Sequence, residues 1–433
     1  MDEKNKQLMQ LDLDVIWHPC TQMKDHERLP LIPISSGKGV YLYDYDNNRY
    51  IDAISSWWVN IFGHCNEFIN DKIKAQLDTL EHVILAGFTH KPAIDLAKKL
   101  VTITPEGLEK VFFADNGSSA VEVALKMSYH AHLNKGIQKP LFLSLSNSYH
   151  GETIGALSVG DVDLYKTSYA PLLLKSIQVP VPANQTLQAA KEAIEVLEIV
   201  LKQKHQEIAA MIVEPLVQGA GGMHMYHPYY LKEARRLTKA NGVYLIADEI
   251  MTGFGRTGKM FACQYAQITP DFMTLSKGLT GGYLPLSVVM TTDDIYNIFY
   301  CDYSEQKAFL HSHSYTGNPL ACIAALATLE IFETQNILID NLQKSSYMAE
   351  QLKRFESLNN VKETRILGMI AAIELSGYLP EERHGLRIHE YALKHGVLLR
   401  PLGNVVYIMP PFIITNEEIK KIFDVVYSAI STL

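Results

Sequence analysis

The chain has 433 residues, of which 47% are hydrophobic and 20% are charged, and its formal net charge is -8. This length exceeds one ordinary hydrophobic core, so we expect about two or three domains, and the composition excludes a disordered or fibrous protein. The negative net charge argues against a surface that binds nucleic acid or an anionic membrane.

Targeting and redox signals favour a cytoplasmic protein. Residues 1–7 are polar and lack the apolar core of a signal peptide. No uninterrupted apolar stretch is long enough to span a bilayer. The five cysteines are scattered and form no Cys-x-x-Cys pair, which favours reduced thiols over a disulfide framework or a zinc site. We therefore expect a cytoplasmic protein without a bound metal.

The N-terminal part predicts a β-hairpin followed by helices. Residues 40–45 and 49–52 have the pattern of two strands, and the Asp-Asn-Asn segment between them suits a turn. From about residue 66, apolar residues recur at helical spacing. Pro92 suits the first turn of a second helix, where its missing N–H costs nothing.

The middle of the chain alternates short apolar strands with helical stretches. The expected strands are residues 110–114, 141–145, 209–214, 243–247, 272–275 and 286–291. This alternation predicts an α/β fold with a large, doubly wound and mostly parallel sheet.

The C-terminal part has a different pattern. After a long helix that begins near residue 317, the expected elements are a helix at 337–355, strands at 362–366 and 369–375, a helix at 385–395, strands at 397–400 and 405–409, and a closing helix from residue 416. This pattern predicts a smaller α+β domain. We expect residues 1–60 to join it, residues 61–325 to form the large domain, and residues 326–433 to complete the small one.

Two strand ends carry opposite charges. The apolar run 243–247 stops at Asp248, and the run 272–275 ends shortly before Lys277. A carboxylate and an amine at neighbouring strand ends suit pyridoxal phosphate (PLP). Its aldehyde forms a Schiff base with lysine, and its pyridinium nitrogen pairs with aspartate. Taken alone, Lys277 also fits a solvated lysine at the end of a strand.

Two more turns follow predicted strands. Gly117 and Ser118 open a helix, where backbone N–H groups and a hydroxyl suit an anion, although a plain helix cap fits as well. Tyr149 can stack on a flat heteroaromatic ring, and Ile250 can cover the other face of that ring. Each of these two also fits an ordinary partly buried position.

Three patterns resemble other sites only in part. Residues 253–260 nearly match a phosphate-binding P-loop, but Met260 stands where that loop needs Ser or Thr. The glycines within residues 219–222 lack the spacing of a dinucleotide site. The histidine pairs in 224–227 and 311–313 have no third metal ligand nearby. These segments therefore do not predict a nucleotide or metal site.

Trp57 and Trp58 are two of only three tryptophans. If they lie in a strand, they face opposite sides, so that one packs in the core while the other lines a cavity.

Taken together, these motifs resemble the class III, fold-type I PLP-dependent aminotransferases over essentially the whole chain. The segments that carry the resemblance are residues 247–250, 253–258 and 276–278, with 214–215 and 317–319 in agreement. The resemblance implies a large PLP-binding domain, a smaller α+β domain and transaminase activity.

Within this class, residues 17–23, 56–58, 218–222 and 400–407 are similar to the branch that aminates 8-amino-7-oxononanoate in biotin biosynthesis. The similarity implies that acceptor, and we expect S-adenosylmethionine as the amino donor, with lysine as the alternative. The paired tryptophans favour S-adenosylmethionine, whereas residues 21–25 and 311–318 are closer to the lysine-using branch. Another ω-amino acid:pyruvate transaminase is the nearest alternative, and a non-catalytic nucleotide-binding protein is a distant one.

The resemblance also assigns roles to residues of the cofactor site. Lys277 would carry the Schiff base, Asp248 would contact the pyridinium nitrogen, and Tyr149 would stack on the ring. Gly117 and Ser118 would hold the phosphate.

The remaining assignments concern the substrate and a second subunit. Ser314 would reach into the site of its neighbour in a homodimer. Arg400 would clamp a substrate carboxylate. The residues implied to line the substrate pocket are Trp57, Trp58, Arg400 and Tyr407. Cys20 departs from the pattern, because the family usually has an aromatic residue there.

Overall fold

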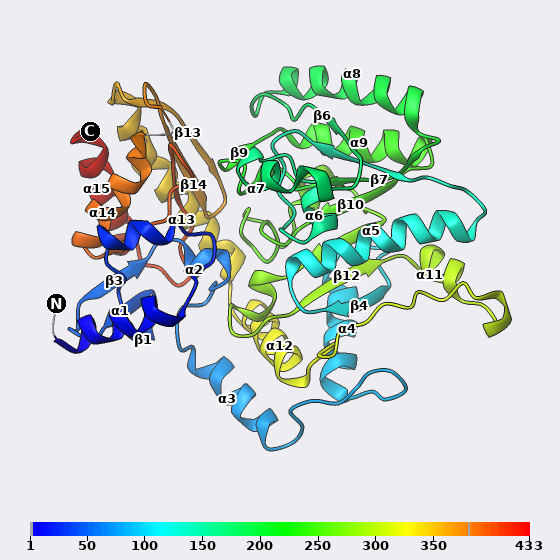
Figure 1. Ribbon diagram of the computed structural model, residues 1–433, viewed down its shortest axis with the longest axis horizontal. Coiled ribbons are helices and arrows are strands. Elements are labelled where there is room, and N and C mark those ends of the chain that lie inside the picture. Colours follow the sequence, from blue (N-terminus) through cyan, green and yellow to red (C-terminus); the bar gives the residue numbers. More distant parts are fainter. Residues whose placement is uncertain (1–2, 380–381) are drawn as a thin grey trace. The chain divides into compact units, whose positions relative to one another are not determined.

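The computed structural model describes residues 3–379 and 382–433 and divides into two compact units (Figure 1). The first unit contains the chain up to Glu67, together with Ser346–Ile366 and Ala371–Leu433. The second contains Phe68–Ser345 and Leu367–Ile370. By this division, the chain passes from one unit to the other after residues 67, 345, 366 and 370. The domain boundaries predicted at residues 60 and 325 stay predictions.

The second unit is built on a seven-stranded sheet with the order β4-β12-β11-β10-β7-β5-β6. Its strands are β4 (Lys110–Ala114), β5 (Leu141–Leu145), β6 (Ser176–Val179), β7 (Ile208–Val213), β10 (Tyr244–Asp248), β11 (Phe272–Leu275) and β12 (Ser287–Thr291). Strand β12 runs antiparallel to both of its neighbours, and the other six strands are mutually parallel. The predicted mostly parallel sheet is therefore confirmed. The sequence did not predict β6 or the short pair β8 (Val217–Gln218) and β9 (His224–Met225).

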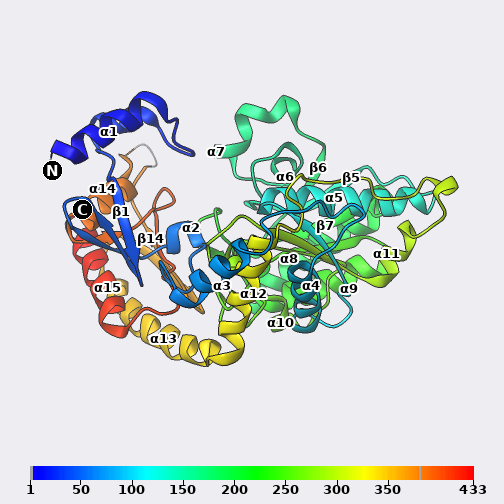
Figure 2. The ribbon, with the colours of Figure 1, turned by 90° about the horizontal axis from the view of Figure 1, so that it is seen from below.

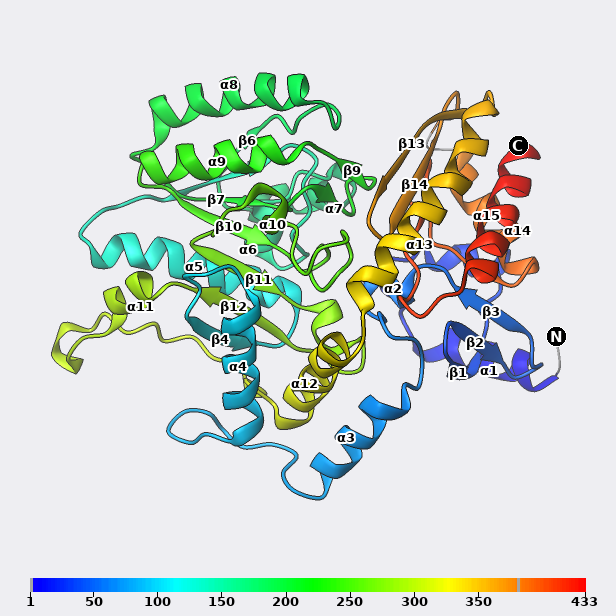
Figure 3. The same ribbon diagram turned by 180° about the vertical axis from the view of Figure 1, so that it is seen from behind.

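Helices cover both faces of this sheet. The longer helices of this unit are α3 (Glu67–Leu77), α4 (Lys91–Ile103), α5 (Gly117–Asn134), α8 (Leu187–Lys204), α9 (Pro228–Ala240) and α12 (Pro319–Thr334). The shorter ones are α6 (Ile154–Ser158), α7 (Asp163–Lys166), α10 (Cys263–Ala266) and α11 (Asp293–Phe299), with 3-10 turns η2 (Thr167–Leu172), η3 (Lys277–Thr280) and η4 (Tyr303–Glu305). Helix α5 leads across the sheet in one direction, from β4 to β5, whereas α8 and α9 lead back in the other. Since crossovers between parallel strands are right-handed, α5 lies on one face and α8 and α9 on the other (Figures 1 and 3).

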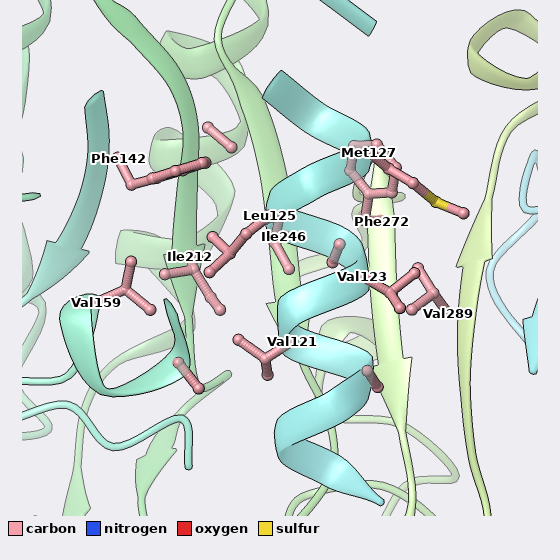
Figure 4. Packing of buried hydrophobic residues seen from close by; sticks show 14 of the residues in the cluster. Val121, Val123, Leu125, Met127, Phe142, Val159, Ile212, Ile246, Phe272 and Val289 are labelled. Atoms are coloured by element: carbon pink, nitrogen blue, oxygen red, sulfur yellow. The ribbon is translucent and has the colours of Figure 1, made fainter. Parts of the chain in front are cut away.

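Helix α5 is fixed to the sheet by an apolar core (Figure 4). Val121 and Val123 on the helix pack toward Ile212, Ile246 and other side chains on the sheet strands, and all are buried. Each fully buried side chain of this kind contributes about 1.5–3 kcal/mol. This packing holds the N-terminus of α5 at one edge of the sheet.

No single helix among the described residues is long and apolar enough to cross a membrane. The consecutive segments Pro319–Thr334 and Ile337–Ser357 are long and apolar enough only when taken together, and the chain bends by 77° between them. Much of α12 is buried within the second unit, which accounts for its apolar composition.

The first unit contains two small sheets. One has the order β1 (Ile34–Lys38), β2 (Tyr41–Asp44), β3 (Arg49–Asp52) and β15 (Val397–Leu398), and the other the order β13 (Val361–Leu367), β14 (Ile370–Leu375) and β16 (Val405–Ile408). Its helices are α1 (Glu3–Val15), α2 (Ser55–Trp58), α14 (His384–Lys394) and α15 (Asn416–Ser431), with 3-10 turns η1 (Met23–Glu27) and η5 (Lys353–Ser357). Helix α13 (Ile337–Leu352) begins in the second unit and continues into the first from Ser346. Figure 2 shows the N-terminal strands, in blue, beside the C-terminal helices, in orange and red. The predicted hairpin is confirmed, because β2 and β3 pair antiparallel.

The paired tryptophans do not lie in a strand. Ser55, Ser56, Trp57 and Trp58 all have positive φ angles, between 46° and 75°, so the chain makes a left-handed turn. The expectation of a strand is wrong here, because the carboxylate of Asp52 accepts a hydrogen bond from the N–H of Ser56 and thereby stabilises a turn. Trp58 is buried and Trp57 is 39% exposed.

Candidate active site

Five parallel strands of the second unit deliver candidate residues at their carboxyl ends. Gly117 follows β4, Tyr149 follows β5, Glu214 follows β7, Asp248 ends β10, and Lys277 follows β11. Because the carboxyl ends of parallel strands share one edge of a sheet, these residues gather at that edge. Ligands of open α/β sheets bind at this edge.

Asp248 is the buried anion of the site. Its Oδ2 lies 2.8 Å from Nδ1 of His150, and its Oδ1 accepts from the N–H of Ile250 at 3.2 Å and from the hydroxyl of Thr274 at 3.3 Å. A carboxylate offers about four acceptor positions, so these three contacts leave about one for a further N–H donor.

His150 pairs with Asp248 and was not among the residues predicted for the site. It is buried, and its second ring nitrogen, Nε2, has no hydrogen-bond partner among the described residues. An unpaired buried polar atom is unfavourable unless a ligand or water satisfies it. His150 directly follows Tyr149 in the sequence, but its contact with Asp248, 98 residues away, is made only in the fold.

Lys277 begins η3 with a φ of 48°, a conformation that few residues other than glycine adopt. Burial lowers the pKa of its amine below the ordinary value, and the negative charges of Asp248 and Glu214 oppose that shift. A lowered pKa leaves more of the amine uncharged and therefore nucleophilic.

Glu214 joins two loops at this edge. Its carboxylate accepts from the N–H of Tyr149 at 2.9 Å and from the N–H of Gly219 at 2.8 Å. Burial raises its pKa to about 7, although the neighbouring His150 lowers it. Glu214 therefore fixes the backbone of Tyr149, whose hydroxyl donates to Glu152 at 3.0 Å.

The N-terminus of α5 forms a compact site that suits an anion. The side chain of Asn116 caps the helix by accepting from the N–H of Ser119 at 3.0 Å. Gly117 packs beneath Ile250, because a Cβ atom at 117 would lie 3.1 Å from that side chain. Backbone N–H groups and the hydroxyl of Ser118 at such a terminus suit a phosphate.

Gly151 makes room for Ser118. A Cβ atom at 151 would lie 2.0 Å from Oγ of Ser118, and the φ of 122° disfavours any side chain. We predict that Gly151→Ala displaces Ser118 and raises the dissociation constant for PLP by about 10- to 100-fold, as loss of one or two charge-assisted hydrogen bonds would. The measurement is titration of the cofactor-free protein with PLP. Gly136→Ala is the control, since Gly136 also has a positive φ but open space around it; equal weakening in both variants would contradict the prediction.

The remaining candidate residues come from other parts of the chain. Ser314 is exposed in the loop before α12, and no hydrogen bond joins its side chain to another described residue. The four residues predicted to line the substrate pocket, Trp57, Trp58, Arg400 and Tyr407, all belong to the first unit.

Within the first unit, these four residues form two contacts. The guanidinium of Arg400 lies 4.6 Å from the ring centroid of Trp57, and its Nη2 donates to the carbonyl of Cys20 at 2.8 Å. The rings of Trp58 and Tyr407 meet edge to face with centroids 6.0 Å apart.

Glu249, beside Asp248, has a structural role. Its buried carboxylate accepts from the N–H groups of Ala262 and Cys263 at 3.0 and 2.7 Å and from the hydroxyl of Thr252 at 2.5 Å. It thus closes the loop that contains residues 253–260, and the only helix that follows at once is the four-residue α10. Within residues 3–379 and 382–433, no group of three or more His, Cys, Asp or Glu side chains could hold a metal ion.

A lysine and a buried aspartate at the carboxyl edge of such a sheet, beside a helix N-terminus that suits a phosphate, are the features of a PLP-dependent enzyme. The chain belongs to the aminotransferase class-III family, whose model matches residues 22–430.

Relatives and solved structures are similar to this chain over nearly its full length and theirs. The adenosylmethionine-8-amino-7-oxononanoate aminotransferase of Helicobacter pylori is 53% identical over 420 residues, which cover 96% of this chain and 95% of the relative. The enzyme of the same name from Anoxybacillus flavithermus is 44% identical, with 96% and 94% covered. The crystal structure of the Methanocaldococcus jannaschii enzyme of that name superposes with a TM-score of 0.95 at 39% identity and covers 99% of both chains. An omega transaminase from Pseudomonas jessenii in complex with PMP has a TM-score of 0.92 at 28% identity, with 98% of both chains covered.

Proposed function

We propose that this protein converts 8-amino-7-oxononanoate to 7,8-diaminononanoate in biotin biosynthesis, with S-adenosylmethionine as the amino donor. The observation that carries the proposal is the set of residues at the carboxyl edge of the sheet, with Asp248 and Lys277 on adjacent strands. The printed names of the most similar relatives supply the substrate.

The residues at this edge fit PLP. The carboxylate of Asp248 has about one acceptor position left for a ring N–H, and His150 holds its other oxygen in place. Tyr149 is half-buried, its backbone is fixed by Glu214, and its ring meets that of Tyr165 edge to face with centroids 5.3 Å apart. A tyrosine ring held in this way suits stacking on a flat heteroaromatic ring. Ile250 lies beside Gly117, where it can cover the other face of the ring.

When bound, PLP supplies an aldehyde that takes up the amino group and a ring that withdraws electrons. Lys277 would hold the aldehyde through Nζ, and the same atom would carry a proton during the reaction. Gly117 and Ser118 hold the phosphate at the N-terminus of α5, because unpaired helix N–H groups favour an anion.

Arg400 and Trp57 suit the carboxylate end of the acceptor. The guanidinium has five N–H donors, and Cys20 is its one hydrogen-bond partner among the described residues. The remaining donors can bind a carboxylate through two parallel hydrogen bonds. The exposed ring of Trp57 provides apolar surface for the aliphatic chain of the acceptor, and the buried ring of Trp58 packs against Tyr407 beside it.

Two further parts of the proposal concern assembly and location. We propose a homodimer in which Ser314 of each subunit contributes to the cofactor site of its partner, consistent with the exposure of this loop. We also propose that the enzyme acts in the cytoplasm.

A single-turnover experiment tests the substrates. The protein saturated with PLP is mixed with S-adenosylmethionine or with lysine, and the visible band of the bound cofactor is followed. We predict that S-adenosylmethionine removes the band and that 8-amino-7-oxononanoate then restores it. Loss of the band with lysine alone would reassign the donor, and restoration by pyruvate but not by 8-amino-7-oxononanoate would favour an ω-amino acid:pyruvate transaminase.

A further inference from the structure

Three strand ends of the first unit meet around the left-handed turn α2. Strands β3 and β15 run parallel, with Asp52 opposite Leu398, so Arg400 lies two residues beyond the partner of Asp52. Met409, directly after β16, donates its N–H to the carbonyl of Ala53 at 2.8 Å. The carbonyl of Met409 accepts from the hydroxyl of Ser55, also at 2.8 Å. The turn is therefore attached to the segments that carry Arg400 and Tyr407.

The conformation of this turn is unfavourable in isolation. Four consecutive residues, Ser55–Trp58, have positive φ, and none is glycine. Residues with a Cβ atom rarely adopt this region, and runs of them are rarer still. Such a conformation persists only where the surrounding structure enforces it.

Asp52 holds the turn in this conformation. Its side chain is fully buried, and its two oxygens accept from the N–H of Ser56 at 2.9 Å and from the hydroxyl of Ser56 at 2.6 Å. A weaker contact of 3.4 Å comes from the N–H of Ile54. Hydrogen bonds to a charged acceptor are roughly twice as strong as those between neutral groups.

His64 orients the carboxylate of Asp52. Nε2 of His64 lies 3.0 Å from Oδ2 of Asp52, and Nδ1 lies 3.0 Å from the side-chain nitrogen of Asn60. Since the Asn60 amide donates to Nδ1, Nε2 carries the proton that is donated to Asp52. The backbone of His64 is held by two hydrogen bonds with Gly39, at 2.7 and 3.1 Å. A Cβ atom at Gly37 would lie 2.8 Å from Cβ of His64, so glycine is needed there to admit the histidine.

We propose that Asp52 and His64 are positioning residues for the acceptor. They hold the left-handed turn that keeps the ring of Trp57 against the guanidinium of Arg400 and the ring of Trp58 against Tyr407. Their effect is on the affinity for the carboxylate end of the acceptor. This inference rests on the proposed function, because it assigns the recognition of that carboxylate to Arg400 and Trp57.

Asp52→Asn is the first test. The substitution preserves shape but turns one acceptor oxygen into a donor, which then faces either the N–H of Ser56, bound at Oδ1, or Nε2 of His64, bound at Oδ2. We expect the KM for 8-amino-7-oxononanoate to rise about 10- to 50-fold, with kcat and the visible band of the bound cofactor within about twofold of wild type. The methyl ester of the acceptor, which lacks the carboxylate charge, is expected to show little difference between the variant and wild type.

Asp44→Asn is the matched control. Asp44 is also buried in this unit and accepts from the N–H groups of Asp46 and Asn48 and from the hydroxyl of Tyr50, but it lies in the hairpin turn at the other end of β3. It should lower the resistance to urea without changing the KM. His64→Leu should raise the KM, and His64→Gln, which keeps an N–H donor, should restore most of the affinity.

The two possible failures are distinguishable. A KM within twofold of wild type in both Asp52→Asn and His64→Leu would overturn the inference, as would an equal loss with the methyl ester. If Asp52→Asn does not fold, His64→Leu and Ser56→Ala, which removes only the hydroxyl contact to Asp52, decide the question by the same measurement. A wild-type protein that does not accept 8-amino-7-oxononanoate would instead overturn the proposed function.

Discussion

Lys277→Ala is expected to abolish the visible band of the bound cofactor and to lower kcat by about 10⁴-fold or more, because the amine serves both as the covalent anchor and as the proton carrier. Burial lowers the pKa of Lys277, which favours the uncharged amine that attacks the aldehyde, although the charges of Asp248 and Glu214 oppose this shift. The measurement combines an absorbance spectrum of the protein saturated with PLP and single-turnover kinetics with S-adenosylmethionine. An unchanged band in the variant would contradict the assignment.

Lys139→Ala controls for the loss of a buried lysine. Lys139 lies in the same unit, burial lowers its pKa as well, and its Nζ donates to the carbonyl of Gly242 at 2.6 Å. Its replacement should reduce resistance to urea and leave both the band and the turnover near wild type. Loss of colour in this variant would show that the absorbance reports folding rather than the anchor.

Asp248→Asn is expected to lower kcat by roughly 10²- to 10³-fold, because a preorganised charge opposite the ring nitrogen is replaced by a neutral amide. The amide also leaves buried His150 without its anionic partner. Cofactor binding should weaken less than turnover, since the phosphate site at the N-terminus of α5 and Lys277 are unchanged. The measurement is the rate of each half-reaction at saturating PLP, and a rate within threefold of wild type would refute the assignment.

Asp271→Asn is the corresponding control. Asp271 accepts from the guanidinium of Arg235 at 3.1 Å and from the N–H of Leu245 at 2.7 Å, so it supports the same sheet. This substitution should lower the free energy of unfolding without a comparable loss of turnover. A matched loss of turnover would mean that the effect of Asp248→Asn is structural.

The sequence predicted the strand ends well because their signals are local. Asp248, Lys277 and Tyr149 each follow a short apolar run, and the parallel sheet then brings such positions to one edge. The contact of His150 with Asp248 joins positions 98 residues apart, and no local pattern encodes it. Strand β6 was missed because its side chains are mostly half-buried and lack a strong apolar pattern.

The left-handed turn at Trp57 and Trp58 could not be read from the sequence. The Ser-Ser-Trp-Trp segment contains no glycine, so its pattern fits a strand better than a run of positive φ angles. The turn is set by tertiary contacts, among them the bond from Ser55 to Met409, 354 residues away. The resemblance pointed to the tryptophans as substrate residues, but it did not indicate the buried Asp52 and His64 that hold them.

The most direct test of the proposed function is to locate the lysine that binds the cofactor. The protein saturated with PLP is treated with borohydride, which reduces the bond between the lysine and the cofactor, and its peptides are mapped by mass spectrometry. We predict one modified peptide, with the phosphopyridoxyl group on Lys277. Modification of Lys139 or Lys259 in place of Lys277, or no modified lysine, would contradict the account.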